Sequence, residues 1–145
     1  MNKIIEIIKK NVSNLKGLNS CQIKKIEQFY NVQLPKEYKI FLSEMGYDAG
    51  DFMRGEDCFY DRIFELREYA TDLLEEDGSD FKLEQEHYVF YSHQGYIFAF
   101  FDTSKDNSEI YYYTEGDMHP TIKYSNFESF LKDYYENMQN DGDFS

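Results

Sequence analysis

The sequence predicts an α+β fold in a single domain, with N-terminal helices and a C-terminal helix packed on a mainly antiparallel sheet. Apolar residues at helical spacing fill the first third of the chain, apolar runs of strand length occupy residues 88–114, and a helical pattern returns after residue 125. The 145 residues suit one domain. We place it at residues 1–145, with its core at about 20–138 and a frayed tail at 139–145.

Three helices are expected before residue 47. The first has a stripe of apolar residues and should end at Gly17. Asn19, followed three residues later by Gln22, predicts a capping box that opens the second helix. Pro35 suits the first position of the third helix, and Gly46 suits a left-handed residue after its end. The apolar faces are Ile4, Ile5, Ile8, Val12 and Leu15 in the first helix, Ile23, Ile26, Phe29 and Tyr30 in the second, and Tyr38, Phe41, Leu42 and Met45 in the third.

The middle of the chain is less regular. Glycines interrupt residues 47–64, where we expect a loop and a short strand near 58–60. A helix should follow, with an apolar face that runs from Leu66 to Leu74 and a turn at residues 75–80. Near the C-terminus, Ser125 and Glu128 form a capping pattern for a last helix, whose face is Phe127, Phe130, Leu131, Tyr134 and Met138.

Three strands are expected at residues 88–92, 96–101 and 109–114, joined by turns at 93–95 and 103–108. A half-buried strand alternates apolar and polar residues, but these strands are apolar or aromatic on both faces. In the first strand, Tyr88 and Phe90 should point one way and Val89 and Tyr91 the other. Helices can cover one face. The second face is covered either by loops and the middle helix or by a partner.

The charge is strongly acidic and uneven. The net charge is −13, with +3 on residues 1–50 and −16 on residues 51–145. Nucleic-acid binding requires basic patches, and anionic membranes also attract cations, so this composition argues against both kinds of partner. Solubility alone, or a basic protein partner, fits the charge. Without a signal-like or membrane-spanning run, we expect a cytoplasmic protein in which Cys21 and Cys58 are reduced thiols in or near the core.

The sequence offers weak candidates for metal sites. Residues 102–113 place oxygen ligands at alternate positions, but Asn107 and Tyr113 replace the glycine and glutamate of a calcium loop. The three histidines have no helical spacing and no neighbouring CxxC pair for zinc. We therefore interpret residues 102–113 as a polar hairpin and the histidines as exposed or hydrogen-bonded, and we expect neither a metal nor a cofactor.

Evidence for catalysis is equally thin. Paired carboxylates are abundant, so no single pair stands out, and the chain lacks the GxSxG, Walker and GxGxxG motifs. A Cys58–His nucleophile is conceivable but unsupported by spacing. Arg54, Arg62 and Arg67 lie among acids, where they neutralise carboxylates or, in a sharper interpretation, form an anion site. We expect no enzyme activity.

Four motifs occur in a fixed order along the chain: the pattern from Ile26 to Gly46 with its Leu34–Pro35 and Phe41–Leu42 pairs, the Ile63–Leu66 segment, the strand ending at Asp102, and the helix opened by Ser125. Together they resemble the SUKH superfamily, which includes fungal glucan-synthesis (cell-wall) regulators and bacterial immunity proteins. In the family, Ile63–Leu66 corresponds to a short strand leading into a helix. The resemblance covers residues 20–138, although the family often has Asn-Gly at 45–46 and often carries tryptophan, which this chain lacks.

The resemblance implies a single α+β domain that binds proteins and carries no catalytic residues. Our leading hypothesis is an immunity protein that neutralises a basic toxin domain, possibly a nuclease. The alternative is a regulatory or scaffold domain that binds an endogenous protein. For steering of a basic partner we select Asp72, Glu75, Glu76, Asp77 and Asp80, and as anchors we select Tyr111 and Tyr113.

Overall fold

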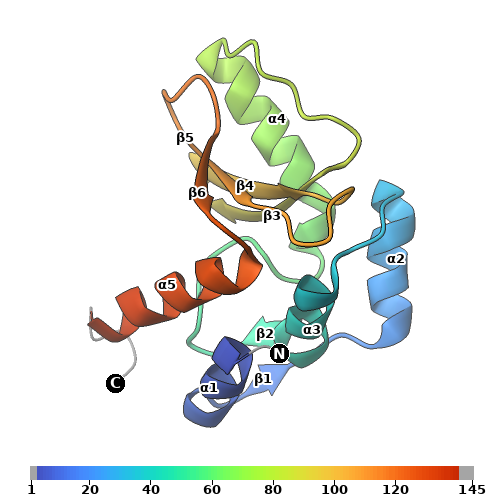
Figure 1. Ribbon diagram of the computed structural model, residues 1–145, viewed down its shortest axis with the longest axis vertical. Coiled ribbons are helices and arrows are strands. Elements are labelled where there is room, and N and C mark those ends of the chain that lie inside the picture. Colours follow the sequence, from blue (N-terminus) through green and yellow to red (C-terminus); the bar gives the residue numbers. More distant parts are fainter. Residues whose placement is uncertain (1–2, 141–145) are drawn as a thin grey trace.

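The computed structural model describes residues 3–140, which form an α+β fold as expected. Figure 1 shows the sheet in the middle of the molecule with helices on both sides. The helices are α1 (Lys3–Asn11), α2 (Ser20–Tyr30), α3 (Lys36–Met45), the 3₁₀ helix η1 (Arg62–Glu65), α4 (Leu66–Asp77) and α5 (Phe127–Asn140). The strands are β1 (Leu15–Lys16), β2 (Asp48–Ala49), β3 (His87–His93), β4 (Ile97–Asp102), β5 (Ile110–Thr114) and β6 (Thr121–Tyr124).

The main sheet is an antiparallel meander in the order β3-β4-β5-β6. Both of its faces are covered by the chain itself (Figure 1). On one face, Phe98, Phe100 and Tyr113 pack with apolar residues of α4. On the other face, Ala99, Phe101 and Ile110 join the larger core, which includes residues of α1, α3 and α5. The middle helix therefore supplies the second cover that the two-sided apolar strands required.

A β-bulge changes the facing of one strand residue. The register of β3 against β4 shifts between Val89 and Tyr91. Val89 packs in the α4 core, while Phe90 and Tyr91 both belong to the larger core. The expectation that Tyr91 shares a face with Val89 is therefore wrong, because the extra residue of the bulge reverses the alternation after it.

The expected helix termini are partly right. The capping box of Asn19 and Gln22 is present, and the apolar face of α3 is buried as expected. Pro35 precedes α3 as its N-cap instead of occupying its first position. Gly46 has φ −71°, so it is not left-handed; a Cβ there would lie 2.7 Å from the carbonyl oxygen of Leu42. The close approach of the Leu42 backbone, and not the backbone conformation of Gly46, requires glycine at this position.

The first helix is shorter than expected. It ends at Asn11, and Leu15 lies in β1, where it pairs with Ala49 of β2. Gly17 does not end the helix. It packs so close to the end of α3 that a Cβ would lie 1.8 Å from the carbonyl oxygen of Ser43. The N-terminal segment also belongs to the main core, because Ile4, Ile5 and Ile8 are buried in it, so the core extends before residue 20.

Two expectations for the middle segment are wrong. No strand forms at residues 58–60; the contact with the sheet is a single bridge between Asp57 and Ser92. The segment before α4 is the 3₁₀ helix η1 instead of a short strand. Of the two cysteines, which are both free, Cys58 is buried, whereas Cys21 is exposed at the start of α2 and is not a core thiol.

The C-terminal third adds a strand that was not predicted. β6 pairs with β5 at the edge of the sheet. The side chain of Asn126, not that of Ser125, caps α5 by accepting the backbone N–H of Ser129 over 2.8 Å. Helix α5 continues through Gln139 and Asn140, so these residues do not belong to a tail, and the rest of the expected tail lies outside the described residues. Within residues 3–140, no helix is long and apolar enough to cross a membrane.

Candidate functional site

A hollow lies between α2 and α4, and we name it the α2–α4 groove. It encloses about 660 Å³ and is lined by Phe29, Tyr30, Phe64, Arg67, Glu68, Thr71, Asp72, Gln85 and His87. Figure 1 shows α2 standing at the side of the sheet, with α4 above it. A concave surface of this size can receive side chains of a partner.

An exposed aromatic side chain forms one wall of the groove. Phe29 is 61% exposed, the largest fraction among the large hydrophobic side chains described. Its ring meets those of Tyr30 and Phe64 edge to face, with centroids 4.9 and 5.1 Å away. These contacts cover part of the ring and leave most of it open to solvent. An exposed aromatic ring is typical of an interface anchor.

Arg67 forms the floor of the groove and is occupied by the backbone. Its guanidinium donates to the carbonyl oxygens of His87 at 2.9 Å, Leu83 at 3.1 Å and Glu84 at 3.2 Å. These bonds tie α4 to the segment that enters β3. Arg54 and Arg62 instead pair with Asp51 and Glu65. The three arginines thus act separately, and the structure does not bring them together as an anion site.

The acidic residues selected for steering divide into two groups. Asp72, Glu75 and Glu76 are exposed on α4, with no hydrogen bond or ion pair to their side chains within residues 3–140, and Asp72 lines the groove. Asp80 is exposed beyond the helix, 3.6 Å from Nε2 of His119. The carboxylate of Asp77 is internally bound instead, because it accepts the Tyr113 hydroxyl and the Gly116 N–H. The Tyr113 bond, followed by the Gly116 bond, lowers the pKa of Asp77.

The two tyrosines selected as anchors differ in the same way. Tyr113 is fully buried beneath α4, and burial, together with its bond to Asp77, raises its pKa to about 12. The structure therefore does not present Tyr113 at the surface, as an anchor requires. Tyr111 is half-buried and stacks on Phe100 with the ring centroids 5.0 Å apart. Sequence reasoning treated both as exposed because it left the position of α4 open.

A buried carboxylate that sequence reasoning missed lies on the opposite side of the sheet. The side chain of Glu56 is 5% exposed. It accepts the hydroxyls of Tyr91 and Tyr134 and is 2.5 Å from Nδ1 of His93. Burial is the main cause that raises the pKa of both tyrosines far above its usual value. The second cause is the negative charge of Glu56 for Tyr91 and the hydrogen bond to Glu56 for Tyr134. Both carboxylate oxygens have partners, so this cluster joins the loop to the sheet and α5.

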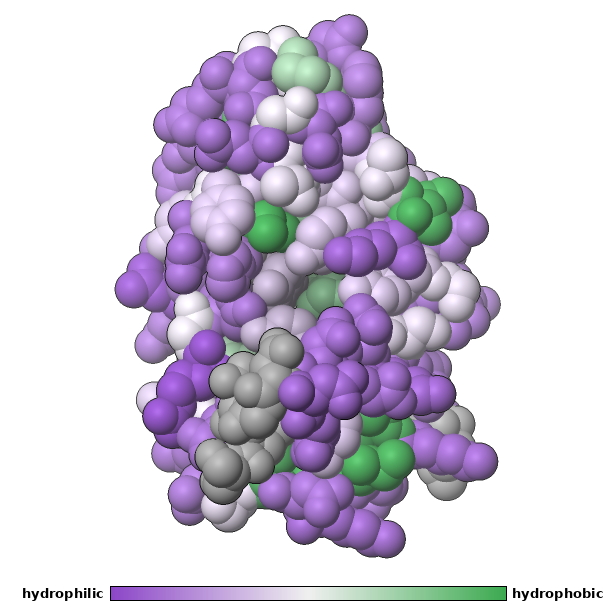
Figure 2. Space-filling model, turned by 90° about the vertical axis from the view of Figure 1, so that its left-hand side faces the viewer, coloured by the Kyte–Doolittle hydropathy of each residue, from purple (hydrophilic) through white to green (hydrophobic). Residues whose placement is uncertain are grey.

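A smaller cleft beside this cluster has four tyrosines in its lining. Tyr91, Tyr112, Tyr124 and Tyr134 surround it, with Phe130 among them. Figure 2 shows this side of the molecule, where pale side chains gather around a hollow between more hydrophilic regions. The Lys123 ammonium lies 4.1 Å from the centre of the Tyr112 ring, so the chain supplies its own cation–π partner here.

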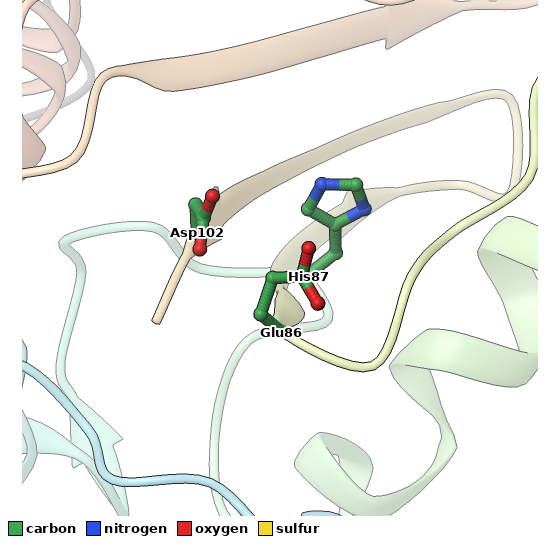
Figure 3. Close-up of side chains that lie close together, drawn as sticks. All are labelled: Glu86, His87 and Asp102. Atoms are coloured by element: carbon green, nitrogen blue, oxygen red, sulfur yellow. The ribbon is translucent and has the colours of Figure 1, made fainter. Parts of the chain in front are cut away.

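One group of side chains has the composition of a metal site. Glu86, His87 and Asp102 each place one ligand atom within 4.8 Å of the others (Figure 3). Nδ1 of His87 accepts the backbone N–H of Glu84 over 2.9 Å. In the neutral ring Nε2 then carries the proton, which suits a hydrogen bond to a carboxylate and not a metal bond. The arrangement therefore argues against a metal bond to His87 at the end of the β3–β4 pair.

Comparison with protein families adds an independent finding. The model of the SUKH_6 family, described as SMI1-KNR4 cell-wall, matches residues 21–131. The match spans α2 to the first turns of α5, and so includes the groove and the whole main sheet. A comparison with curated proteins gave no match.

Proposed function

Because the chain belongs to the SUKH_6 family, described as SMI1-KNR4 cell-wall, we propose that it is a non-catalytic protein-binding domain that acts as an immunity protein. In this role it binds a basic toxin domain and blocks it. Membership of the family is consistent with immunity or regulatory protein-binding domains. We propose a basic toxin because this chain is strongly acidic.

The observation that carries the proposal is the exposed acidic face of α4. Asp72, Glu75 and Glu76 project from one helix beside the α2–α4 groove and have no ion-pair partner within the described chain. Exposed acids repel one another at helical spacing, so they weaken the isolated helix slightly. A basic partner removes that repulsion and is attracted over about 8–10 Å at physiological salt. Fast capture is the expected benefit of such a surface.

The test compares two triple charge reversals. Asp72→Lys, Glu75→Lys and Glu76→Lys together remove the acidic face of α4. Asp106→Lys, Glu109→Lys and Glu136→Lys make the same change in net charge at exposed acids on other elements. Each tagged protein is used to capture partners from the native host at low salt, and the complexes are washed at high salt.

The expected result is a basic partner that wild type and the control variant retain at low salt and the α4 variant loses. Co-expression of the chain must also suppress the toxicity of that partner in a sensitive host. Equal capture by the two variants overturns the assignment of the α4 face. A captured partner that is not toxic overturns the immunity role.

The second candidate is a regulatory domain that binds an endogenous protein. The cell-wall description of the matching family model favours it. In this case the captured partner is a housekeeping protein of the same cell, and deletion of the gene for this chain changes cell-wall properties without exposure to any toxin.

A further inference from the structure

Phe29 is costly to leave exposed and has no role in either core. Its ring belongs to neither apolar cluster, although its neighbours Tyr30 and Phe64 pack against the larger one. Covering the exposed part of the ring removes apolar surface from water, which favours binding. The ring makes T-shaped contacts with those two neighbours, and the rest of its surface is open to a partner.

The α4 side of the groove carries two acids without an ion-pair partner among the described residues. Glu68 and Asp72 lie one helical turn apart on α4 and both line the groove. Neither has an ion pair or a side-chain hydrogen bond in the described chain, and like charges at this spacing destabilise a helix. The cation nearest along the helix, Arg67, hydrogen-bonds three backbone carbonyls and forms no ion pair with either acid, so both carboxylates stay available to a partner.

These two unsatisfied features share one groove and call for one chemistry. A flat cation with an apolar stem satisfies both, because guanidinium stacks on aromatic rings and pairs with carboxylates. An ammonium group stacks less well and pairs as a point charge. The lysines of α2, Lys24 and Lys25, lie outside the lining and leave this wall acidic.

We propose that the α2–α4 groove is the docking site for an arginine-bearing segment of the protein partner. The arginine side chain lies on the open face of Phe29, and its guanidinium pairs with Glu68 and Asp72. An apolar neighbour of that arginine covers Phe64. The existence of a partner rests on the proposed immunity function, and the residue chemistry of its contact is the new element.

The test uses a tryptophan reporter, because the chain contains no tryptophan. Phe29→Trp keeps an aromatic ring at the groove and gives a single tryptophan, whose emission can be followed separately from that of the tyrosines. The ligand is a synthetic amphipathic peptide with leucine and arginine at i, i+4 spacing. Two matched peptides replace each arginine with lysine or with citrulline, which has the same shape as arginine but no charge.

The arginine peptide is expected to shift the tryptophan emission and to bind several-fold more tightly than the lysine peptide. The citrulline peptide should bind at least tenfold more weakly. Glu68→Gln with Asp72→Asn should weaken the arginine peptide about tenfold, whereas the matched pair Glu75→Gln with Glu76→Gln should leave its binding within twofold. Calorimetry with Phe29→Ala should show a similar loss, with unchanged circular dichroism.

Three results overturn this proposal. Equal binding of the citrulline peptide means that the groove recognises apolar surface only. If none of the three peptides binds, the groove is not a docking site. A concentration-dependent dimer of the wild type, abolished by Phe29→Ala, means that a second copy covers the groove. If these tests fail but a toxic partner is still captured, the groove proposal is wrong and the immunity function stands. If the arginine peptide binds but no partner is captured, the groove chemistry stands and the immunity function loses its support.

Discussion

The hydroxyl of Tyr134 on α5 donates a hydrogen bond to the carboxylate of Glu56, a residue 78 positions earlier in the chain. Tyr91 of β3 donates to the same oxygen over 2.9 Å, and His93 contacts the other. Because Glu56 lies in the loop between β2 and η1, its side chain joins that loop, the sheet and the last helix at one buried point.

Replacement of Glu56 should therefore destabilise the fold. Glu56→Gln keeps an acceptor but loses the charge, and we expect a loss of about 1.5 kcal/mol in the free energy of unfolding. Glu56→Ala leaves two tyrosine hydroxyls without their acceptor, and we expect about 3 kcal/mol. Denaturant unfolding measures both values. Glu136→Gln, at an exposed position of the same α5 helix, should change stability by less than about 0.5 kcal/mol.

Acid should weaken the link between α4 and the β5–β6 turn. The folded-state pKa of Asp77 is lowered by the Tyr113 hydroxyl and the Gly116 N–H. The stabilisation is therefore complete above the unfolded pKa of Asp and is lost as pH falls through the lower folded pKa. Asp77→Asn should reduce the loss of stability between about pH 4 and 2, whereas Asp72→Asn, which lacks such bonds, should not. Identical acid profiles for Asp77→Asn and wild type would falsify this link.

Alkali should unfold the protein through its buried tyrosines. Burial is the main cause that raises the pKa of Tyr30 and of Tyr113 to about 12. A tyrosine in the unfolded chain ionises near pH 10, so stability is complete below that pH and is lost as pH rises through 12. Absorbance at 295 nm should show tyrosine ionisation delayed past pH 10 and then completed together with unfolding. Phe substitution at Tyr30 should make the alkaline loss shallower; ionisation of all tyrosines near pH 10 without unfolding contradicts the prediction.

The sequence was sufficient for the features that depend on near neighbours. The capping box at Asn19 and the buried face of α3 depend on residues within one or two turns, and both were predicted. The two-sided apolar strands also indicated that both faces need a cover, but left open whether the chain or a partner covers the second one. The chain can therefore be assigned to its fold class without structural information.

The remaining features depend on contacts that no local pattern carries. The bulge after Val89 and the edge strand β6 are set by pairing with other strands. The partners of Glu56 are 35, 37 and 78 residues away, so an acid among many acids gave no signal. The groove combines α2 with α4, and of the residues that line it only Asp72 was selected beforehand. From the sequence, Phe29 was assigned to the apolar face of the second helix. Only the position of α4 relative to α2 shows that its ring lies at the surface.

Gly17 gives the sharpest test of how the N-terminal segment packs. A Cβ at this position would lie 1.8 Å from the carbonyl oxygen of Ser43, and backbone at the end of α3 cannot move aside as a flexible side chain can. The neighbouring Leu18 N–H donates to the carbonyl oxygen of Leu42 over 2.9 Å, so relief of the clash also strains that bond. We expect Gly17→Ala to lower the free energy of unfolding by about 3 kcal/mol, at the upper end of overpacking costs.

Gly55→Ala is the matched control, because nothing lies within 4 Å of its Cβ position and only its φ of +84° resists the change. That control should cost about 1–2 kcal/mol. If denaturant unfolding shows Gly17→Ala to be no less stable than Gly55→Ala, then β1 and α3 are not packed as closely as described.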